Sequence, residues 1–333
     1  MARILRQGER LQDVPALMDE ALAIYPDDPM LWLVKIRSLA ALGNHDLALA
    51  VAKEADAHFA ALTAAPTEPG PVAVPIDPDE LPQDEFHSAL PTDSFSVELA
   101  DYYAQNNQID HALGILRPLA EKDELGLSPS LWLARLLLGT GRQMEGTNLV
   151  EEINAKWPNA GRGWFLRGKI EEGLGAWEAS IPFFRRAVEL EPYDPEIRLG
   201  LVRAMLVSWE VDLRGDAPDS TARAKIEEFE VHCMTAATLV SENDTQGQML
   251  LGYGFRALGD LDRATWRFKL AAENPDLRLQ ALIQKSICHD ENGEEAQARF
   301  DLELLRREYP DDPEVANSLG YFLAEKGTDL DLA

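Results

Sequence analysis

A residue suited to ending a helix recurs at a fixed interval along this chain. Gly141 and Gly175 lie 34 residues apart, and the same spacing separates Gly259 from Gly293 and Gly293 from Gly327. A constant period of this length is the sequence signature of a repeat architecture, in which each unit packs only against its neighbours. The spacing therefore predicts one elongated array, although a chain of 333 residues could also form two ordinary domains.

The same register continues toward the N-terminus, with two interruptions. Asn107 lies one period before Gly141, and Glu9 lies one period before Gly43. The distance from Gly43 to Asn107 exceeds one period by 30 residues. The distance from Gly175 to Gly259 exceeds two periods by 16 residues. Both gaps predict insertions in an otherwise constant register.

Around each of these residues the sequence has the pattern of a helical hairpin. The clearest copy contains Leu251, Gly252, Phe255, Gly259, Ala264, Phe268, Ala271 and Pro275. The pattern resembles the tetratricopeptide repeat, which has Trp, Leu-Gly and Tyr in its first helix, Ala and Phe in its second, and Pro at its end. The resemblance covers nearly the whole chain and implies an all-α fold, a right-handed α-solenoid of stacked antiparallel helix pairs. Residues 317–321 resemble bacterial members of the family, so we expect a bacterial protein.

Positions are counted from the first residue of each repeat, so that the recurring helix-ending residue is at position 15. Small residues occupy two positions at which the helices of a hairpin are expected to approach closely. A bulky side chain at either position would force the two helices apart. Those at position 8 are Ala100, Ala134, Gly168, Gly252 and Gly320; Gly200 joins them only if the register near residue 195 is moved by two. Those at position 20 are Ala48, Ala112, Ala264 and Ala298. Glycine at position 15 is expected to end the first helix in a left-handed conformation.

The register divides residues 1–333 into a single solenoid. Full repeats are expected at about 29–62, 93–126, 127–160, 161–194, 195–244, 245–278 and 279–312, with partial repeats at 1–28 and 313–333. A solenoid exposes its core unless polar faces cap its ends, and neither end of this sequence has such a cap. We therefore expect a fragment of a longer repeat protein, whose open ends are candidates for self-association.

The two insertions differ in character. Residues 61–92 contain seven prolines, six acidic residues and no Lys or Arg, which predicts an acidic extended loop. This loop is either a solvated tether or a segment whose apolar side chains dock on the groove or on a partner. The second insertion lies around 210–222, where a helix is expected to break at residues 214–220, and Ser220 or Thr221 to cap the next helix.

Composition excludes several classes of protein. The chain has 58 acidic and 31 basic residues, a formal net charge of −27, whereas nucleic-acid binding rests on clustered cations. No apolar run is long enough to predict a membrane-spanning helix, and the polar first residues are unlike a signal peptide. We expect a soluble protein of the bacterial cytoplasm or periplasm that neither binds nucleic acid nor inserts into a membrane.

No sequence motif indicates catalysis. Phosphate-binding glycine loops, the zinc motif HExxH and the hydrolase motif GxSxG are all missing. Cys233 and Cys288 are too few for a disulfide framework or a Cys-rich zinc site, and buried free thiols are favoured over one long-range disulfide. His289 falls at a repeat position that is normally a buried aromatic, so a packed ring is favoured over a metal ligand. We expect no enzymatic activity, no cofactor and no metal.

The remaining candidate for function is a surface that binds another protein or a peptide. The resemblance implies that positions 2, 5, 9, 12 and 13 of the first helices face a concave groove. A partner's acidic groups would meet the cations of this groove, and its apolar groups would meet the large side chains. The candidate cations are Arg37, Arg135, Arg162 and Lys169, and the candidate apolar and aromatic residues are Leu131, Phe165, Leu201, Met205, Met249, Tyr253, Ile287 and Tyr321.

Other interpretations stay open. The cations could simply solubilise helix faces, with their stems packed on neighbouring side chains. The chain could be a structural module that self-associates through its ends or its first insertion, or a regulatory fragment of a larger protein. The family's chaperone-binding clamp is not expected, because position 5 is mostly apolar and position 9 has no Asn.

Overall fold

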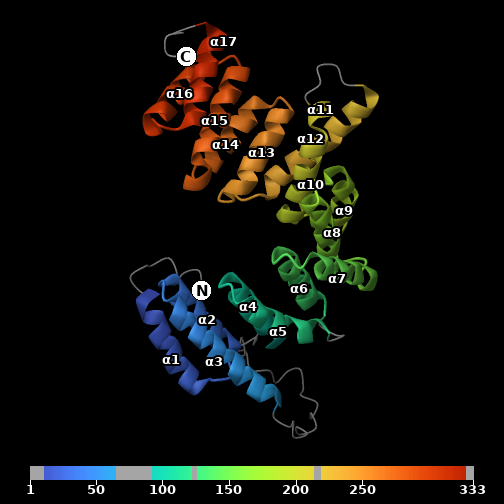
Figure 1. The fold of residues 1–333 in the computed structure, drawn as a ribbon, viewed down its shortest axis with the longest axis vertical. Coiled ribbons are helices and arrows are strands. Elements are labelled where there is room, and N and C mark those ends of the chain that lie inside the picture. Colours follow the sequence, from blue (N-terminus) through green and yellow to red (C-terminus); the bar gives the residue numbers. More distant parts are fainter. Residues whose placement is uncertain (1–10, 65–91, 122–125, 214–218, 328–333) are drawn as a thin grey trace, which may run out of the picture. The chain divides into compact units, whose positions relative to one another are not determined.

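The computed structural model describes residues 11–64, 92–121, 126–213 and 219–327, and this part of the chain consists of helices and the turns between them, without a strand. It divides into two compact units, Met1–Leu149 and Val150–Ala333, and each is described by itself below. Figure 1 labels the helices, which follow the sequence from blue to red. The predicted all-α repeat fold is confirmed, whereas a single solenoid over 1–333 stays a prediction.

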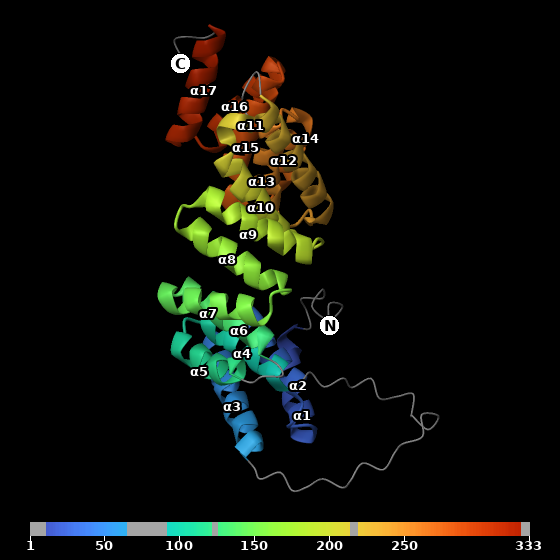
Figure 2. The same ribbon diagram turned by 90° about the vertical axis from the view of Figure 1, so that its right-hand side faces the viewer.

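The first unit is built from pairs of neighbouring helices joined by short turns, and consecutive helices pack against each other (Figure 2). Its elements are the 3₁₀ helix η1 (Leu11–Asp13) and the helices α1 (Val14–Ile24), α2 (Pro29–Ala41), α3 (His45–Ala64), α4 (Thr92–Gln105), α5 (Ile109–Ala120), α6 (Leu127–Gly139) and the beginning of α7 (Gln143–Lys156). The boundary between the two units falls within α7. Residues 65–91, most of the first insertion, lie outside the described residues.

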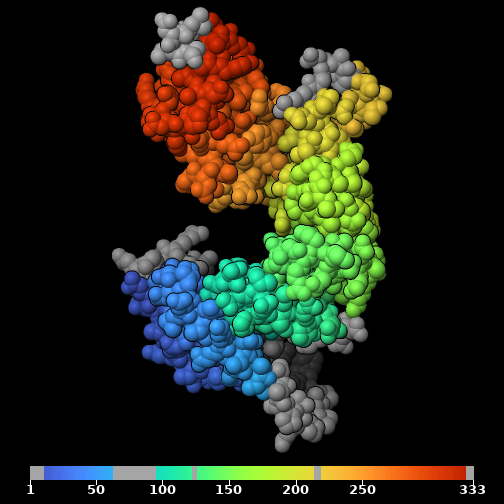
Figure 3. Space-filling view, in the orientation of Figure 1, coloured from blue at the N-terminus to red at the C-terminus, as the bar shows by residue number. Residues whose placement is uncertain are grey.

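The second unit continues the same alternation of first and second helices. Its elements are the end of α7 and the helices α8 (Gly161–Gly173), α9 (Trp177–Leu190), α10 (Pro195–Ser208), α11 (Glu210–Leu213), α12 (Ser220–Leu239), α13 (Thr245–Ala257), α14 (Leu261–Ala271), α15 (Pro275–Glu291), α16 (Glu295–Glu308) and α17 (Pro313–Lys326). In the space-filling view of Figure 3, the segment from α13 to α17 forms one packed mass, coloured orange to red. The helices α2, α4, α6, α8, α10, α13, α15 and α17 are the first helices of their repeats.

Side-chain caps fix where many of these helices begin. Aspartate or asparagine before the helix accepts a hydrogen bond from a backbone N–H of the first turn, which satisfies a donor that has no partner within the helix. These caps are Asp28, Asp194, Asp219, Asp244, Asp260, Asn274 and Asp312. One cap differs from expectation, because α12 is capped by Asp219 rather than by Ser220 or Thr221. The helix α15 begins at Pro275, four residues before the expected start of its repeat at about 279.

The 34-residue series marks the left-handed residues of the backbone. Every described member has a positive φ, between 58° and 80°, and among the described residues Asn107 is the one non-glycine with such a φ. A residue without a Cβ adopts this conformation without the steric cost that other L-residues incur, which is why glycine ends these helices. The predicted role of position 15 is confirmed for Gly43, Asn107, Gly141, Gly175, Gly259, Gly293 and Gly327. Glu9 lies outside the described residues.

The small residues at positions 8 and 20 lie where they were expected, inside the hairpins. A Cβ built on Gly168 would lie 2.7 Å from the ring of Phe184, and one built on Gly252 would lie 2.5 Å from the ring of Phe268. The alanines at position 20 are fully buried at Ala48, Ala112, Ala264 and Ala298. These rings of the second helix therefore pack directly on the backbone of the first.

The two-residue shift of register at α10 is wrong. Gly200 faces Phe184 and Phe165 of the preceding repeat, not a ring of its own second helix, α12. The residue one period after Lys169 is Arg203, which is partly exposed as Lys169 is, whereas Leu201 is fully buried. The unshifted register therefore holds, because α10 begins at Pro195, one period after α8 begins at Gly161.

Both cysteines are free and buried, as expected. Cys233 lies in the core of the second unit beside Gly254, and Cys288 lies in the same core. Burial raises the pKa of the Cys233 thiol well above its ordinary value, and it raises the pKa of Cys288 to about 11. Neither thiol is therefore suited to act as a nucleophile near neutral pH.

Candidate functional site

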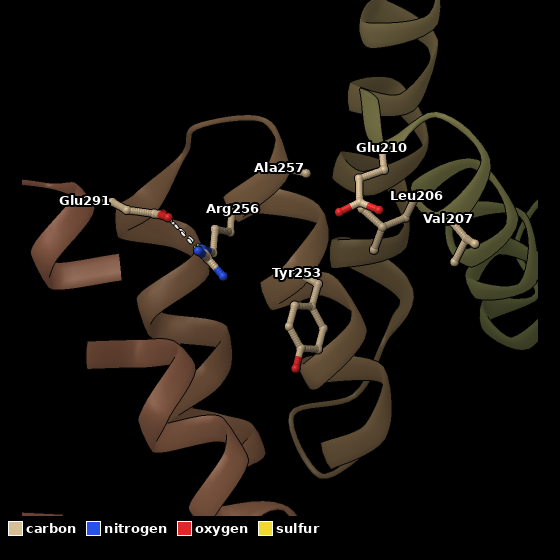
Figure 4. A pocket seen from close by; sticks show the side chains of 7 residues that line it. All are labelled: Leu206, Val207, Glu210, Tyr253, Arg256, Ala257 and Glu291. Atoms are coloured by element: carbon tan, nitrogen blue, oxygen red, sulfur yellow. Dashed lines mark hydrogen bonds and ion pairs between the residues drawn. The ribbon is translucent and has the colours of Figure 1, made fainter. Parts of the chain in front are cut away.

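The second unit contains a pocket of about 360 Å³ between first helices of successive repeats, with part of its wall from α11 (Figure 4). It is lined by Leu206 and Val207 of α10, Glu210 of α11, Tyr253, Arg256 and Ala257 of α13, and Glu291 of α15. Tyr253 and Arg256 stand on one side in Figure 4, and Leu206 and Glu210 face them from the other side. We call these seven residues the Tyr253 pocket.

The helical period explains why these residues meet. Tyr253, Arg256 and Ala257 are spaced i, i+3 and i+4, so their side chains lie on one face of α13. In the repeat they occupy positions 9, 12 and 13, and Leu206 and Val207 occupy positions 12 and 13 of the preceding repeat. These are positions that the family resemblance assigned to the concave face.

Arg256 is held in place by its neighbours on α15. Its Nε and Nη2 donate to the two carboxylate oxygens of Glu291 at 2.9 and 2.5 Å, and its Nη1 donates to Gln284 Oε1 at 2.8 Å. The hydrogen bond to Glu291 raises the pKa of Arg256, so the guanidinium is charged at any physiological pH. These hydrogen bonds fix the position of Arg256 at the rim of the pocket. They also occupy the donors of Arg256, which is the one cation among the seven residues of the lining.

Tyr253 supplies an aromatic wall. Its ring meets Phe268 edge to face, with the ring centroids 5.3 Å apart. Burial raises the pKa of Tyr253, and the charge of Glu314 raises it further, against the opposing effect of Arg256. The hydroxyl is therefore protonated at neutral pH and can donate a hydrogen bond to a ligand.

The first unit has a smaller pocket of about 300 Å³ between α4, α5 and α6. The guanidinium of Arg135 lies over the ring of Trp132, 5.6 Å from its centroid, and this pair forms one wall. Asp101, which accepts a hydrogen bond from Gln105 at 2.7 Å, lies in the same lining. The rest of the lining is mainly apolar and comprises Ala100, Ala104, Ile109, Leu116, Leu136, Gly139 and Thr140.

The predicted groove residues fall into several environments. Arg135 and Tyr253 line the two pockets just described. Phe165, Leu201, Met205 and Met249 are buried in the core of the second unit, so their side chains are not exposed to a partner. Leu131 and Ile287 are half-buried, and Arg37 and Tyr321 are exposed outside both pockets. A single groove along the whole chain stays a prediction.

The candidate cations are mostly paired with carboxylates of the chain itself. Arg162 contacts Asp194 and Glu196, the latter at 2.5 Å, and its backbone N–H donates to Glu191 at 2.9 Å. The Lys169 ammonium donates to Glu172 at 2.9 Å. Arg37 pairs with Glu98 at 2.6 Å. The sequence reveals the cations but not these partners, and the partners weaken the case for an acidic ligand.

Six of the seven residues of the Tyr253 pocket were not among the candidate residues. Their signal was present at positions 12 and 13, which supply Leu206, Val207, Arg256, Ala257 and Glu291. Position 5 instead faces the core in five repeats, in which Leu33, Val97, Phe165, Met249 and Ile283 are buried. Glu210 belongs to the second insertion, so no repeat position could have indicated it.

His289 is a largely buried member of a polar network. Its Nδ1 lies 2.6 Å from Glu294 Oε2, and its Nε2 lies 3.5 Å from Asp301 Oδ2. Lys285 also donates to Asp301, at 2.9 Å. Within the part of the chain that the structure describes, no three His, Cys, Asp or Glu side chains are grouped so as to hold a metal ion.

His232 is held neutral inside the second unit. Its Nδ1 accepts a hydrogen bond at 2.9 Å from Nη1 of Arg198, which can only donate. Burial lowers the pKa of His232 below its ordinary value of 6.5; Arg198 lowers it further, Glu228 opposes the change, and Arg185 contributes slightly in the same direction as Arg198. The folded imidazole therefore takes up a proton less readily than the unfolded one.

We expect the free energy of unfolding to decrease as the pH is lowered below about 6.5. The pKa of His232 is lower in the folded protein than in the unfolded chain. The contribution of neutral His232 to stability is therefore complete above the pKa of the unfolded chain, and it is lost as the pH falls through the pKa of the folded protein. Urea denaturation between about pH 5 and 7 measures this slope. His232→Gln keeps an acceptor for Arg198 without titrating, so its curve should be flatter; an unchanged slope in this variant contradicts the assignment.

Comparisons with known proteins support the repeat assignment. The sequence profile of the tetratricopeptide repeat matches residues 133–195. The cytochrome c-type biogenesis protein CycH of Bradyrhizobium diazoefficiens is 28% identical over 192 residues, which cover 55% of this chain and 47% of that protein. The chain therefore matches about half the length of this relative. No helix in the described ranges combines the length and apolar character needed to cross a membrane.

Two solved structures share the fold at low sequence identity. The chain from the Cut9–Hcn1 hetero-tetramer of the APC/C is similar over 94% of this chain and 53% of its own length, with a TM-score of 0.53 and 13% identity. PilW, described as a widely conserved type IV pilus biogenesis factor, is similar over 69% of this chain and all of its own length, with a TM-score of 0.51 and 14% identity. At such identities the likeness concerns the fold alone.

Proposed function

We propose that this chain, a tetratricopeptide-repeat protein, is a non-catalytic interaction module. It binds a protein partner on the faces of its first helices. The observation that carries this proposal is the Tyr253 pocket, which is formed at positions 9, 12 and 13 of adjacent repeats. An apolar and aromatic wall bordered by charged groups is the composition that peptide-binding pockets use. The Trp132–Arg135 pocket of the first unit has a similar composition.

The relative suggests the process in which this module acts. CycH is named for cytochrome c-type biogenesis, and the match covers about half of each chain. We propose that this protein supports the same process by holding a protein component of it. This part of the proposal rests on the relative, and the binding part rests on the pocket, so the two are tested separately.

Cross-linking in cells tests the binding part. A photoreactive amino acid is introduced either at Val207, which lines the Tyr253 pocket and is 45% exposed, or at Val211, which does not line it and is 86% exposed. We expect a defined protein adduct from the Val207 position and none from the Val211 position. An adduct made only of two copies of this chain would favour self-assembly instead, and equal adducts from both positions would contradict a specific pocket.

Truncation of the aromatic wall should weaken the partner's binding strongly. Tyr253→Ala removes a half-buried aromatic side chain at the centre of the pocket, and such truncations commonly cost about 2 kcal/mol or more, roughly 30-fold in affinity. Tyr193→Ala is the matched control, because Tyr193 is 81% exposed and lies outside both pockets. Titration of the cross-linked partner against each purified variant measures the effect, and equal affinities for both variants would contradict the proposal.

The biogenesis part is tested by genetic complementation. Deletion of the gene should lower the amount of haem-stained c-type cytochromes, and the wild-type gene should restore it. The Tyr253→Ala gene should restore it less well than the Tyr193→Ala gene. Normal cytochrome levels in the deletion strain would refute the biogenesis role and leave the binding proposal to be judged by the cross-linking.

A further inference from the structure

The smaller pocket of the first unit, the Trp132–Arg135 pocket, contains a cation whose surroundings differ from those of the other candidate cations. Arg37, Arg162 and Lys169 each contact a carboxylate of the chain. The guanidinium of Arg135 forms no ion pair or hydrogen bond with any residue that the structure describes, and it lies over the ring of Trp132 instead. Because Arg135 is exposed, its N–H donors are open to a partner.

A second donor on the same wall also lacks an acceptor. The indole N–H groups of Trp32 and Trp164 donate to the backbone carbonyls of Pro26 and Pro158, at 2.8 and 2.9 Å. The indole N–H of Trp132 has no acceptor within the described ranges, although its nitrogen is not shut off from solvent. An indole N–H normally finds a partner when it is buried, so a group that covers this pocket must supply an acceptor.

The rest of the pocket favours an apolar group beside that acceptor. Ile109, Leu116 and Leu136 belong to the lining, and the volume of about 300 Å³ lies at the lower end of the range for small-ligand sites. The hydroxyl of Thr140 donates to the backbone carbonyls of Leu136 and Leu137 at 2.8 and 3.2 Å, so it does not compete for the ligand. The pocket therefore suits one large apolar side chain next to one acceptor.

Asp101 limits where a negatively charged acceptor can lie. It is the carboxylate of the lining, it accepts a hydrogen bond from Gln105, and no ion pair joins these described side chains of Asp101 and Arg135. A ligand carboxylate is thus expected on the Arg135 side of the pocket, with Asp101 opposing it. The net charge of −27 opposes it less, because charges more than about 10 Å away are largely screened at about 0.1 M salt.

We propose that the Trp132–Arg135 pocket binds an internal Asp or Glu side chain of a partner protein, one that stands next to a large apolar side chain. The carboxylate accepts hydrogen bonds from Arg135 and from the indole N–H of Trp132, and the apolar neighbour rests on Ile109 and Leu136. A charged acceptor is favoured because a hydrogen bond to a guanidinium is strongest when the acceptor is ionised. This inference rests on the proposed binding function, and it narrows the acidic ligand expected from the sequence to one cation.

Three short peptides test the chemistry of the ligand. Both ends of each peptide are blocked, so that no terminal charge remains, and the peptides differ only in one pair of neighbouring residues, which is Glu–Phe, Gln–Phe or Glu–Ser. Fluorescence anisotropy with the full chain should show the Glu–Phe peptide binding at least about tenfold more tightly than the other two, because each of them lacks one of the required groups. Equal binding of the Gln–Phe peptide, or binding only when the C-terminus is a free carboxylate, would overturn the proposal.

Charge reversal at one residue tests whether the peptide binds in the pocket. Arg135→Glu and Lys53→Glu both change the net charge by two, but Lys53 is an exposed residue of α3 outside the lining. We expect Arg135→Glu to weaken the Glu–Phe peptide by about tenfold and Lys53→Glu by less than about twofold. Asp101→Asn should strengthen it by about two- to threefold, because the opposing charge is removed. Equal losses for the two Glu variants, or a loss for Asp101→Asn, would refute the site.

Cross-linking in cells tests which molecule occupies the pocket. A photoreactive amino acid at Thr140, an exposed residue of the lining, should capture a segment of another protein in which Asp or Glu adjoins a large apolar residue. A captured segment without this pair of residues would contradict the proposal. A link formed only within this chain, or only between two copies of it, would contradict it as well.

The results also separate this inference from the proposed function. If the Val207 position captures a partner but the Glu–Phe peptide binds independently of Arg135, the acidic-ligand inference fails and the binding function stands. If the Val207 position captures no partner while the peptide depends on Arg135, the chemistry of the Trp132–Arg135 pocket stands. The proposed function, which the Tyr253 pocket carries, then fails.

Discussion

Replacing Phe184 by alanine is expected to lower the free energy of unfolding of the second unit by about 3–5 kcal/mol. The ring of Phe184 is fully buried and packs against Phe165 and against the backbone of Gly168 and Gly200. Its removal would leave a cavity that fixed helix backbones cannot fill. Urea denaturation followed by circular dichroism measures the loss, analysed with a repeat model where the unfolding is not two-state.

The same substitution at an exposed position provides the control. Phe300 of α16 is 58% exposed, so Phe300→Ala should change the free energy of unfolding by no more than about 0.5 kcal/mol. If the two variants lost equal stability, Phe184 would not be the packing centre that its contacts indicate. Phe184→Leu should lie between wild type and Phe184→Ala, because it retains part of the buried volume.

Adding a single methyl group at Gly252 is expected to destabilise the protein by about 1–3 kcal/mol. The new Cβ would lie 2.5 Å from the ring of Phe268, which is fully buried and has no room to withdraw. Either the ring or α13 must shift, and both are packed in the core of the second unit. The midpoint of urea denaturation measures the effect of Gly252→Ala.

Gly173→Ala is the matched control for this prediction. Gly173 ends α8, and a Cβ built on it meets no atom within 4 Å. Alanine loses less conformational entropy than glycine when a helix forms, so Gly173→Ala should be neutral or stabilising by up to about 1 kcal/mol. A stabilising effect at Gly252 as well would show that the hairpin is less tightly closed than the contacts indicate.

Much of the fold was predictable because local chemistry repeats. The glycine series predicted the ends of the first helices, since a left-handed residue is needed there whatever the helices pack against. The small residues at Gly168 and Gly252 predicted where the hairpin closes, because only a residue without a side chain allows a ring to pack on the backbone. The two buried free thiols, Cys233 and Cys288, were predicted separately, because free Cys behaves as a small hydrophobic residue.

The binding surface was predicted less well, for a physical reason. Position 5 was expected to face a partner, but Phe165 and Met249 are buried by the neighbouring repeats. Sequence periodicity gives the direction of a side chain around its own helix, whereas its exposure depends on how close the next helix lies. The neighbouring positions 9, 12 and 13 stay accessible and line the Tyr253 pocket.

By itself, the sequence determined the repeat, the all-helical fold and the ends of the first helices, because these depend on residues a few positions apart along one helix or turn. The tertiary structure alone decided which of the candidate cations are paired with carboxylates of the chain itself. Arg162 and Lys169 are cations in the sequence, yet in the fold they meet Asp194, Glu196 and Glu172. Arg162 and Glu196 are separated by a full period, so only the stacking of one repeat on the next brings them together. A charge acts through its neighbours in space, and the stacking of the repeats creates those neighbours.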